Sequence, residues 1–163
     1  MKSIIQIHLE YKKDVIRDIE INFTSNLEEL NKAIVSAFEL DKNELSSFYI
    51  TNNEFELLQE IPLFSVEDNE NSMLGMSDII ISSILKEEGS QLLYINNFIK
   101  MWRFLITLTK ITKDEITNAK CIKSLGIMPE EAPEISFKAE KQFDPFDEAF
   151  DDSDEFNDYE EEY

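Results

Sequence analysis

The side chains that most often perform chemistry are few in this sequence and stand far apart. The chain has one histidine, His8, and one cysteine, Cys121. A catalytic histidine needs a partner within hydrogen-bond reach, a nucleophilic cysteine needs a base that lowers its pKa, and a structural zinc ion needs about four nitrogen or sulfur ligands. We therefore expect no catalytic residue and no metal site. His8 is predicted to lie on the polar side of a strand, and Cys121 to be a half-buried structural thiol.

Phosphate and nucleic-acid chemistry also lack their usual signatures. The three glycines, Gly75, Gly89 and Gly126, are too far apart in the sequence to form a phosphate-binding loop. The net charge of −20 argues against contact with a phosphate backbone, which requires clustered Lys and Arg. We therefore expect no cofactor and no nucleic-acid ligand, and any electrostatic partner should be basic.

The negative charge is concentrated in residues 140–163, which contain twelve Asp or Glu and one Lys. This contrast predicts a folded domain over 1–139 and an acidic tail over 140–163. The tail lacks the spacing and central glycine of an EF-hand, so its aspartates do not predict a calcium site. Its aromatic residues recur at spacings of three and four, which a helix would place on one face. They are Phe143, Phe146, Phe150, Phe156, Tyr159 and Tyr163.

Three interpretations of this tail are open. It is a disordered, solubilising segment, because its charge density is high. Alternatively it packs on its own domain, because aromatic side chains are unfavourable in water. In the third interpretation it docks on a partner, with its aromatic residues in grooves and its acids selecting a basic surface. The third interpretation makes the six aromatic residues candidates for partner binding.

The element that organises the fold is predicted from the longest apolar run, residues 92–108, which contains the only tryptophan, Trp102. A short apolar strand, an Asn-Asn turn and a second strand with alternating apolar residues predict a β-hairpin. A membrane helix would not accommodate the lysine and arginine near the centre of this run at low cost. We therefore expect the hairpin to lie in the core of a domain outside the membrane.

Two further strands are predicted over residues 4–11 and 15–23, where apolar and polar residues alternate on either side of a short turn. Arg17 interrupts the apolar side of the second strand. It is expected either to reach solvent at a sheet edge or to pair with a carboxylate. Asn26 and Glu29 then form a capping-box-like pair, and apolar residues follow at helical spacing. They are Leu27, Leu30, Ala33, Ile34, Ala37 and Phe38.

The remaining segments give weaker patterns. Residues 48–50 predict a short strand, and the chain is expected to return from it near 55–58. The apolar residues of 76–86 fit either a helix or a strand. Residues 121–133 contain one Gly and two Pro and predict mostly turns. Together the segments predict an α+β fold, with a mainly antiparallel β-sheet, helices packed on it and the acidic tail at the end.

Four segments of the chain carry a resemblance to a known family. They are VIRDIEI at 15–21, LEELNKAI followed by AF within 27–38, ELSSFY at 44–49 and LYINNFIKMW at 93–102. In this order they are similar to segments of the plasmid pRi (root-inducing plasmid) ORF-three-like family, also described as transposon passengers or TnpR-like proteins. The resemblance covers about residues 4–130. It implies an α+β fold, and it implies no established molecular activity.

The chain departs from the family pattern at polar positions, so it is identified as a divergent member. The family's Asp-Phe-Gly-Asp-x-Trp stands here as Asn-Phe-Ile-Lys-Met-Trp, and the histidine of its helix is replaced by Asn31. If the replaced residues form a site in the family, this chain has lost that site, while Phe98 and Trp102 keep the packing part. The positions to follow in the fold are Arg17, Asn31, Asn97, Phe98, Lys100 and Trp102.

The expected function is an interaction or accessory module without enzymatic activity, whose acidic tail engages a basic protein. A recombinase would need several arginines around its serine, and only Arg17 and Arg103 are present. The lone cysteine and the absence of a signal peptide predict the cytoplasm. One alternative is an acidic nucleic-acid mimic that inhibits a DNA-binding protein. Another is an enzyme, which would require a pocket gathering His8, Arg17 and Tyr94.

Overall fold

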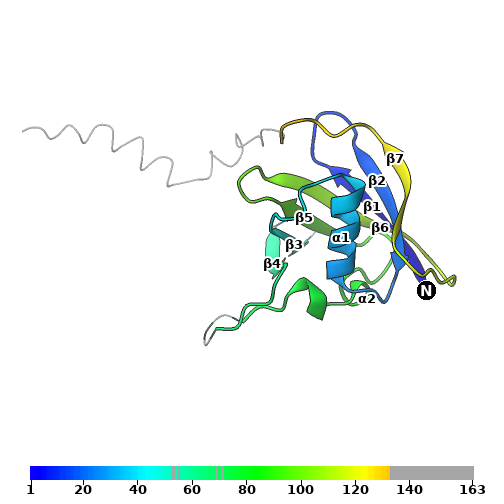
Figure 1. Cartoon of the computed structure of the whole chain (residues 1–163). Coiled ribbons are helices and arrows are strands. Elements are labelled where there is room, and N and C mark those ends of the chain that lie inside the picture. Colours follow the sequence, from blue (N-terminus) through cyan, green and yellow to red (C-terminus); the bar gives the residue numbers. More distant parts are fainter. Residues whose placement is uncertain (53, 55, 69, 71, 133–163) are drawn as a thin grey trace, which may run out of the picture. The chain divides into compact units, whose positions relative to one another are not determined.

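The computed structural model describes residues 1–52, 54, 56–68, 70 and 72–132. Within these ranges seven strands form one sheet in the order β4-β3-β5-β6-β1-β2-β7 (Figure 1). Every neighbouring pair is antiparallel, which confirms a mainly antiparallel sheet. The strands are β1 Lys2–Leu9, β2 Ile16–Asn22, β3 Ser46–Thr51, β4 Leu57–Pro62, β5 Gln91–Asn96, β6 Trp102–Thr112 and β7 Lys120–Leu125.

The central strands alternate between a buried and a partly exposed face, as their sequences predict. In β1 every second residue from Ser3 to Leu9 is buried, and in β6 the same holds from Trp102 to Leu108. The predicted hairpin is present, with Asn96 opposite Trp102 at its closed end. We call the face that carries these buried residues the inner face and the opposite one the outer face.

Helix α1, Leu27–Ala37, covers the inner face (Figure 1). The side chain of Asn26 caps it by accepting a hydrogen bond from the backbone N–H of Glu29 at 2.9 Å, as the sequence predicts. Its apolar stripe then packs into the same core as the inner residues of the sheet. The stripe is buried at Leu27, Leu30 and Ile34. The chain that follows the helix lines the same cavity as the β5–β6 turn.

The segment 76–86, for which the sequence allows helix or strand, is largely helical. It forms the short helix η1, Met76–Asp78, and the single turn α2, Ile81–Ile84. Met76, Ile81 and Leu85 are fully buried in the core. These short helices add to the layer that α1 forms on the inner face, which gives the strand-rich α+β arrangement. No helix in the described ranges is long and apolar enough to cross a membrane.

Strand β7 corrects the prediction of mostly turns for residues 121–125, whereas residues 126–132 form neither helix nor strand, as that prediction expects. It pairs with β2, from Leu125 opposite Ile16 to Lys120 opposite Glu20. All of its residues are exposed, so the strand has no alternating apolar pattern that a sequence could reveal. It is an edge strand that depends on its hydrogen bonds to β2. The predicted tail, residues 140–163, lies outside the described residues.

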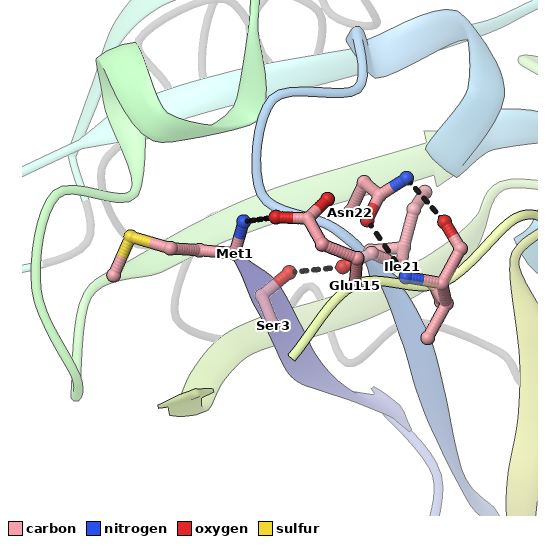
Figure 2. A network of polar contacts seen from close by, with 6 residues as sticks. Met1, Ser3, Ile21, Asn22 and Glu115 are labelled. Atoms are coloured by element: carbon pink, nitrogen blue, oxygen red, sulfur yellow. Dashed lines mark hydrogen bonds and ion pairs between the residues drawn. The ribbon is translucent and has the colours of Figure 1, made fainter. Parts of the chain in front are cut away.

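The connection from β6 to β7 is fastened to the ends of β1 and β2 by polar contacts (Figure 2). The side chain of Asn22 donates to the carbonyl of Ile116 at 2.6 Å and accepts from its N–H at 3.2 Å. The amino group of Met1 pairs with Glu115, and the Ser3 hydroxyl donates to a carbonyl of β2. The contacts of Met1 and Asn22 hold the connection beside the ends of β1 and β2. Strand β7 then pairs with the open edge of β2, because β6 already lies between β5 and β1.

Candidate functional site

A cavity of about 270 Å³ lies where three segments distant in the sequence meet. They are the β5–β6 turn, the chain that follows α1 and the chain that follows β7. Its apolar wall is made of core or half-buried side chains from all three segments. These are Phe38, Leu40, Trp102, Met128 and Pro129. We call this hollow the acidic cavity, because Glu39, Asp41, Glu44 and Glu130 also line it.

The β5–β6 turn places Asn97 and Lys100 in the wall of the acidic cavity. Asn97 has a φ of 65°, in the left-handed region that asparagine tolerates better than most residues. Its side-chain oxygen accepts hydrogen bonds from the backbone N–H groups of Ile99 and Lys100, each at 3.0 Å. Since a carboxylate could accept the same two bonds, the family's Asp at this position is compatible with a role in shaping the turn.

Arg17 binds the ends of the two elements, α1 and β7, whose following segments line the acidic cavity. Its guanidinium donates to the carbonyls of Ala37 at 3.3 Å and Leu125 at 3.0 Å, which are the last residues of α1 and β7. It also lies 5.0 Å from the centre of the Phe38 ring, which lines the cavity. The prediction that Arg17 reaches solvent at a sheet edge or pairs with a carboxylate is therefore wrong. Backbone carbonyls accept the hydrogen bonds of the guanidinium because the C-terminal ends of α1 and β7 both lie close to Arg17 on β2.

Asn31 belongs to a buried polar network that reaches the acidic cavity through Asn96. Its side-chain oxygen accepts hydrogen bonds from the hydroxyls of Ser46, at 2.9 Å, and Tyr94. Tyr94 in turn accepts one from the side chain of Asn96 at 3.1 Å. Burial raises the pKa of Tyr94 to about 12, against the smaller opposing effect of its hydrogen bonds. The network joins α1 to β3 and β5, so Asn31 has a structural role here.

The charges around the acidic cavity are poorly matched. Four carboxylates face one cation, Lys100. Within the described part of the chain, none of these five side chains forms an ion pair. Carboxylates beside an aromatic wall suit an ammonium or guanidinium group, which gains both charge attraction and contact with the ring face. Over the same described ranges, no three His, Cys, Asp or Glu side chains are grouped so as to hold a metal ion.

The other residues singled out in the sequence lie elsewhere. His8 is on the outer face with a 36% exposed side chain, as predicted, and its Nε2 is 3.4 Å from Asp14. It lines a different cavity, which neither Arg17 nor Tyr94 lines, so the pocket required for the enzyme alternative is absent from the cavities described. Two predictions are wrong. Cys121 is exposed because β7 is an edge strand, and Phe98 is 43% exposed because it lies at the tip of the turn.

The sequence does not reveal the acids of the cavity. Glu39, Asp41 and Glu44 follow a helix and Glu130 stands between two prolines of the C-terminal half, positions typical of solvated loops. Only the pairing of β7 with β2, which has no sequence pattern, brings Glu130 beside the end of α1. The predicted partner-binding residues Phe143, Phe146, Phe150, Phe156, Tyr159 and Tyr163 lie outside the described residues.

Fold and site together define a strand-rich α+β protein with an acidic, aromatic-walled cavity at one end of its sheet. Its fold is similar to the crystal structure of a protein of unknown function from Methanosarcina mazei Go1, with a TM-score of 0.65. The two are 18% identical, and the match covers 96% of this chain and 86% of that chain. The likeness at this identity concerns the fold alone. No curated protein matches the chain.

The chain belongs to the family of plasmid pRiA4b ORF-3-like proteins, whose model matches residues 3–161. The resemblance to the plasmid ORF-three-like family is thereby confirmed. The match also runs beyond the residues, about 4–130, over which the resemblance was traced in the sequence. Of the six family-motif positions, Asn97, Lys100 and Trp102 line the acidic cavity. Arg17 donates hydrogen bonds to the ends of α1 and β7, whose following segments line it.

Proposed function

We propose that this protein is a non-enzymatic interaction module that binds a partner with a basic surface. The observation that carries this proposal is the acidic cavity, in which four carboxylates surround an aromatic wall and have no ion-pair partner among the described residues. Its volume suits a lysine or arginine side chain better than a folded element. The acidic and aromatic residues of 140–163 support the same kind of partner.

The lining of the cavity supports binding over catalysis. Among the described residues that line it there is no His, Cys, Ser or Thr, so the commonest general base at neutral pH and the commonest nucleophiles are missing from this part of the cavity. The carboxylates Glu39, Asp41 and Glu130 are exposed and Glu44 is half-buried. Exposed carboxylates of this kind contribute long-range attraction and selectivity for a basic partner, and this attraction weakens as salt screens it.

The cavity is tested by measuring the affinity of an oligolysine peptide for the full chain by calorimetry. The double variant Glu44→Gln, Glu130→Gln should weaken binding by about tenfold, equivalent to roughly 1.4 kcal/mol. The matched control Glu56→Gln, Glu87→Gln makes the same change in net charge away from the cavity and should weaken binding only about twofold. Equal losses in the two double variants would show that the cavity has no special part and would contradict the proposal.

The tail is tested separately in the full chain. Replacement of Phe143, Phe146, Phe150, Phe156, Tyr159 and Tyr163 by serine keeps every acidic residue and removes only the aromatic anchors. Pull-downs with this variant should lose partners that the native chain recovers. Recovery of the same partners would refute docking by the aromatic residues. If the recovered partners are DNA-binding proteins that duplex DNA displaces, the nucleic-acid mimic becomes the better description.

A further inference from the structure

The outer face of the sheet carries a second cavity, of about 350 Å³, which the proposed function does not use. Its floor is apolar: Leu93 and Leu105 lie opposite each other in the β5–β6 pair. Leu93 is only 9% exposed although it lies on the face that α1 leaves uncovered. Polar residues stand around this floor, among them His8, Glu10 and Arg103. We call this hollow the outer cavity.

Arg103 of the outer cavity has an ion pair, but its guanidinium lacks hydrogen-bond partners. Its Nε lies 3.2 Å from a carboxylate oxygen of Glu10, but that nitrogen is buried and the contact lacks the geometry of a hydrogen bond. No described residue accepts a hydrogen bond from either of its terminal amino groups. Arg17, the other arginine of the chain, donates to three carbonyls. The contrast indicates that the Arg103 guanidinium is available to a ligand.

The neighbours of Arg103 define the chemistry that would fit. A guanidinium with free terminal amino groups binds a carboxylate through two parallel hydrogen bonds. The side chain of His8, opposite Leu105 in the pairing of β1 with β6, adds a further donor at the rim. The two leucines of the floor offer contact to an apolar body, and the volume lies at the lower end of small-molecule sites. Inorganic anions would leave this floor unused.

We propose that the outer cavity binds a small carboxylate with an apolar or aromatic body, its carboxylate on Arg103 and its body on Leu93 and Leu105. Glu10 competes for the same guanidinium. Because its side chain is 59% exposed, it can turn to solvent when a ligand carboxylate takes its place. The net charge of −20 repels anions in general, so affinity for a carboxylate must come from this local arrangement.

Benzoate is a suitable probe, with benzamide as its uncharged match and inorganic phosphate as an anion without an apolar body. Binding to the full chain is followed by amide chemical shifts in NMR spectra. Benzoate should shift the signals of residues around Leu93 and Leu105. Both benzamide and phosphate should bind at least about tenfold more weakly than benzoate, since each lacks one of the two contacts. Equal binding of benzamide or of phosphate would overturn the proposal.

Three variants locate the site. Arg103→Gln should weaken benzoate binding at least about tenfold. Lys110→Gln removes the same charge from an exposed position of the same strand and should change binding less than about twofold. Glu10→Gln should strengthen binding about threefold, because it removes the competing carboxylate. Equal effects of the first two variants would reduce the interaction to general electrostatics and refute the site, as would weaker binding in Glu10→Gln.

Discussion

The acidic cavity and the outer cavity lie on opposite sides of the same strand, β6, and two adjacent residues of this strand each line one of them. Trp102 faces the inner side and lines the acidic cavity, whereas Arg103 lines the outer cavity. Each also contains one residue of the opposite sign, Lys100 in the first and Glu10 in the second. From this comparison we expect the local arrangement of charge, more than the net charge of −20, to determine what each surface binds.

The largest expected difference between the two sides is in stability. Trp102→Ala removes a side chain that is only 7% exposed and should lower the free energy of unfolding by about 3–5 kcal/mol. Arg103→Ala removes a partly exposed side chain with one ion pair and should lower it by less than about 1 kcal/mol. Urea denaturation measures both values. Similar losses for the two variants would mean that the outer side of β6 contributes to the core as the inner side does.

The next largest effect is expected on the stability of the fold at alkaline pH. Tyr94, on the inner face, has its pKa raised from 10 to about 12 by burial. Between these values the unfolded chain loses the proton while the folded chain keeps it, so stability should fall by roughly 2–3 kcal/mol as pH rises. Burial and the nearby Glu60 raise the pKa of Tyr49 on the outer face as well. Tyr94→Phe, followed by denaturation at each pH, should remove most of the decline; a decline that persists would assign it to other groups.

A smaller loss of stability is expected from the β5–β6 turn, which lines the acidic cavity. Asn97→Ala loses two hydrogen bonds to backbone N–H groups and places a Cβ-bearing residue without a polar side chain at a φ of 65°. It should destabilise the fold by about 1–2 kcal/mol. Asn97→Gly keeps the backbone freedom and should cost less. Equal losses in thermal unfolding would show that the hydrogen bonds alone stabilise the turn.

The smallest expected effect concerns the residue of opposite sign in the acidic cavity. Lys100→Gln removes the one cation among the described residues that line the cavity and should strengthen binding of an oligolysine peptide about threefold. This is the counterpart of the Glu10→Gln variant in the outer cavity. Calorimetry at low salt is the appropriate measurement, because screening would hide so small a change. A weaker interaction would indicate that Lys100 itself contacts the peptide, for instance through a carboxylate or carbonyl.

Alternation and capping in the sequence predict the inner framework well. The spacing of apolar residues predicts strands β1, β2 and β6. One side-chain cap, Asn26, predicts the start of α1. These signals are local, which is why they can be read from the chain. Asn97 at a turn with positive φ belongs to the same group.

The acidic cavity could be predicted only in part, because it depends on contacts between distant segments. Lys100 and Trp102 could be selected from the hairpin, but Glu130 enters the site through β7, an exposed strand without a pattern. The position of Arg17 was also misjudged for this reason. Its acceptors at Ala37 and Leu125 come from elements that the sequence does not place beside β2.

Trp102 has one more consequence, because it is the only tryptophan of the chain. It is nearly buried and lines the acidic cavity, so its fluorescence emission should lie toward the blue, as expected for an indole in an apolar environment. A cation that enters this cavity should alter the intensity or wavelength of that emission. A carboxylate bound on the other side of β6 should leave it nearly unchanged. The protein therefore contains an unlabelled optical reporter that distinguishes occupation of one cavity from occupation of the other.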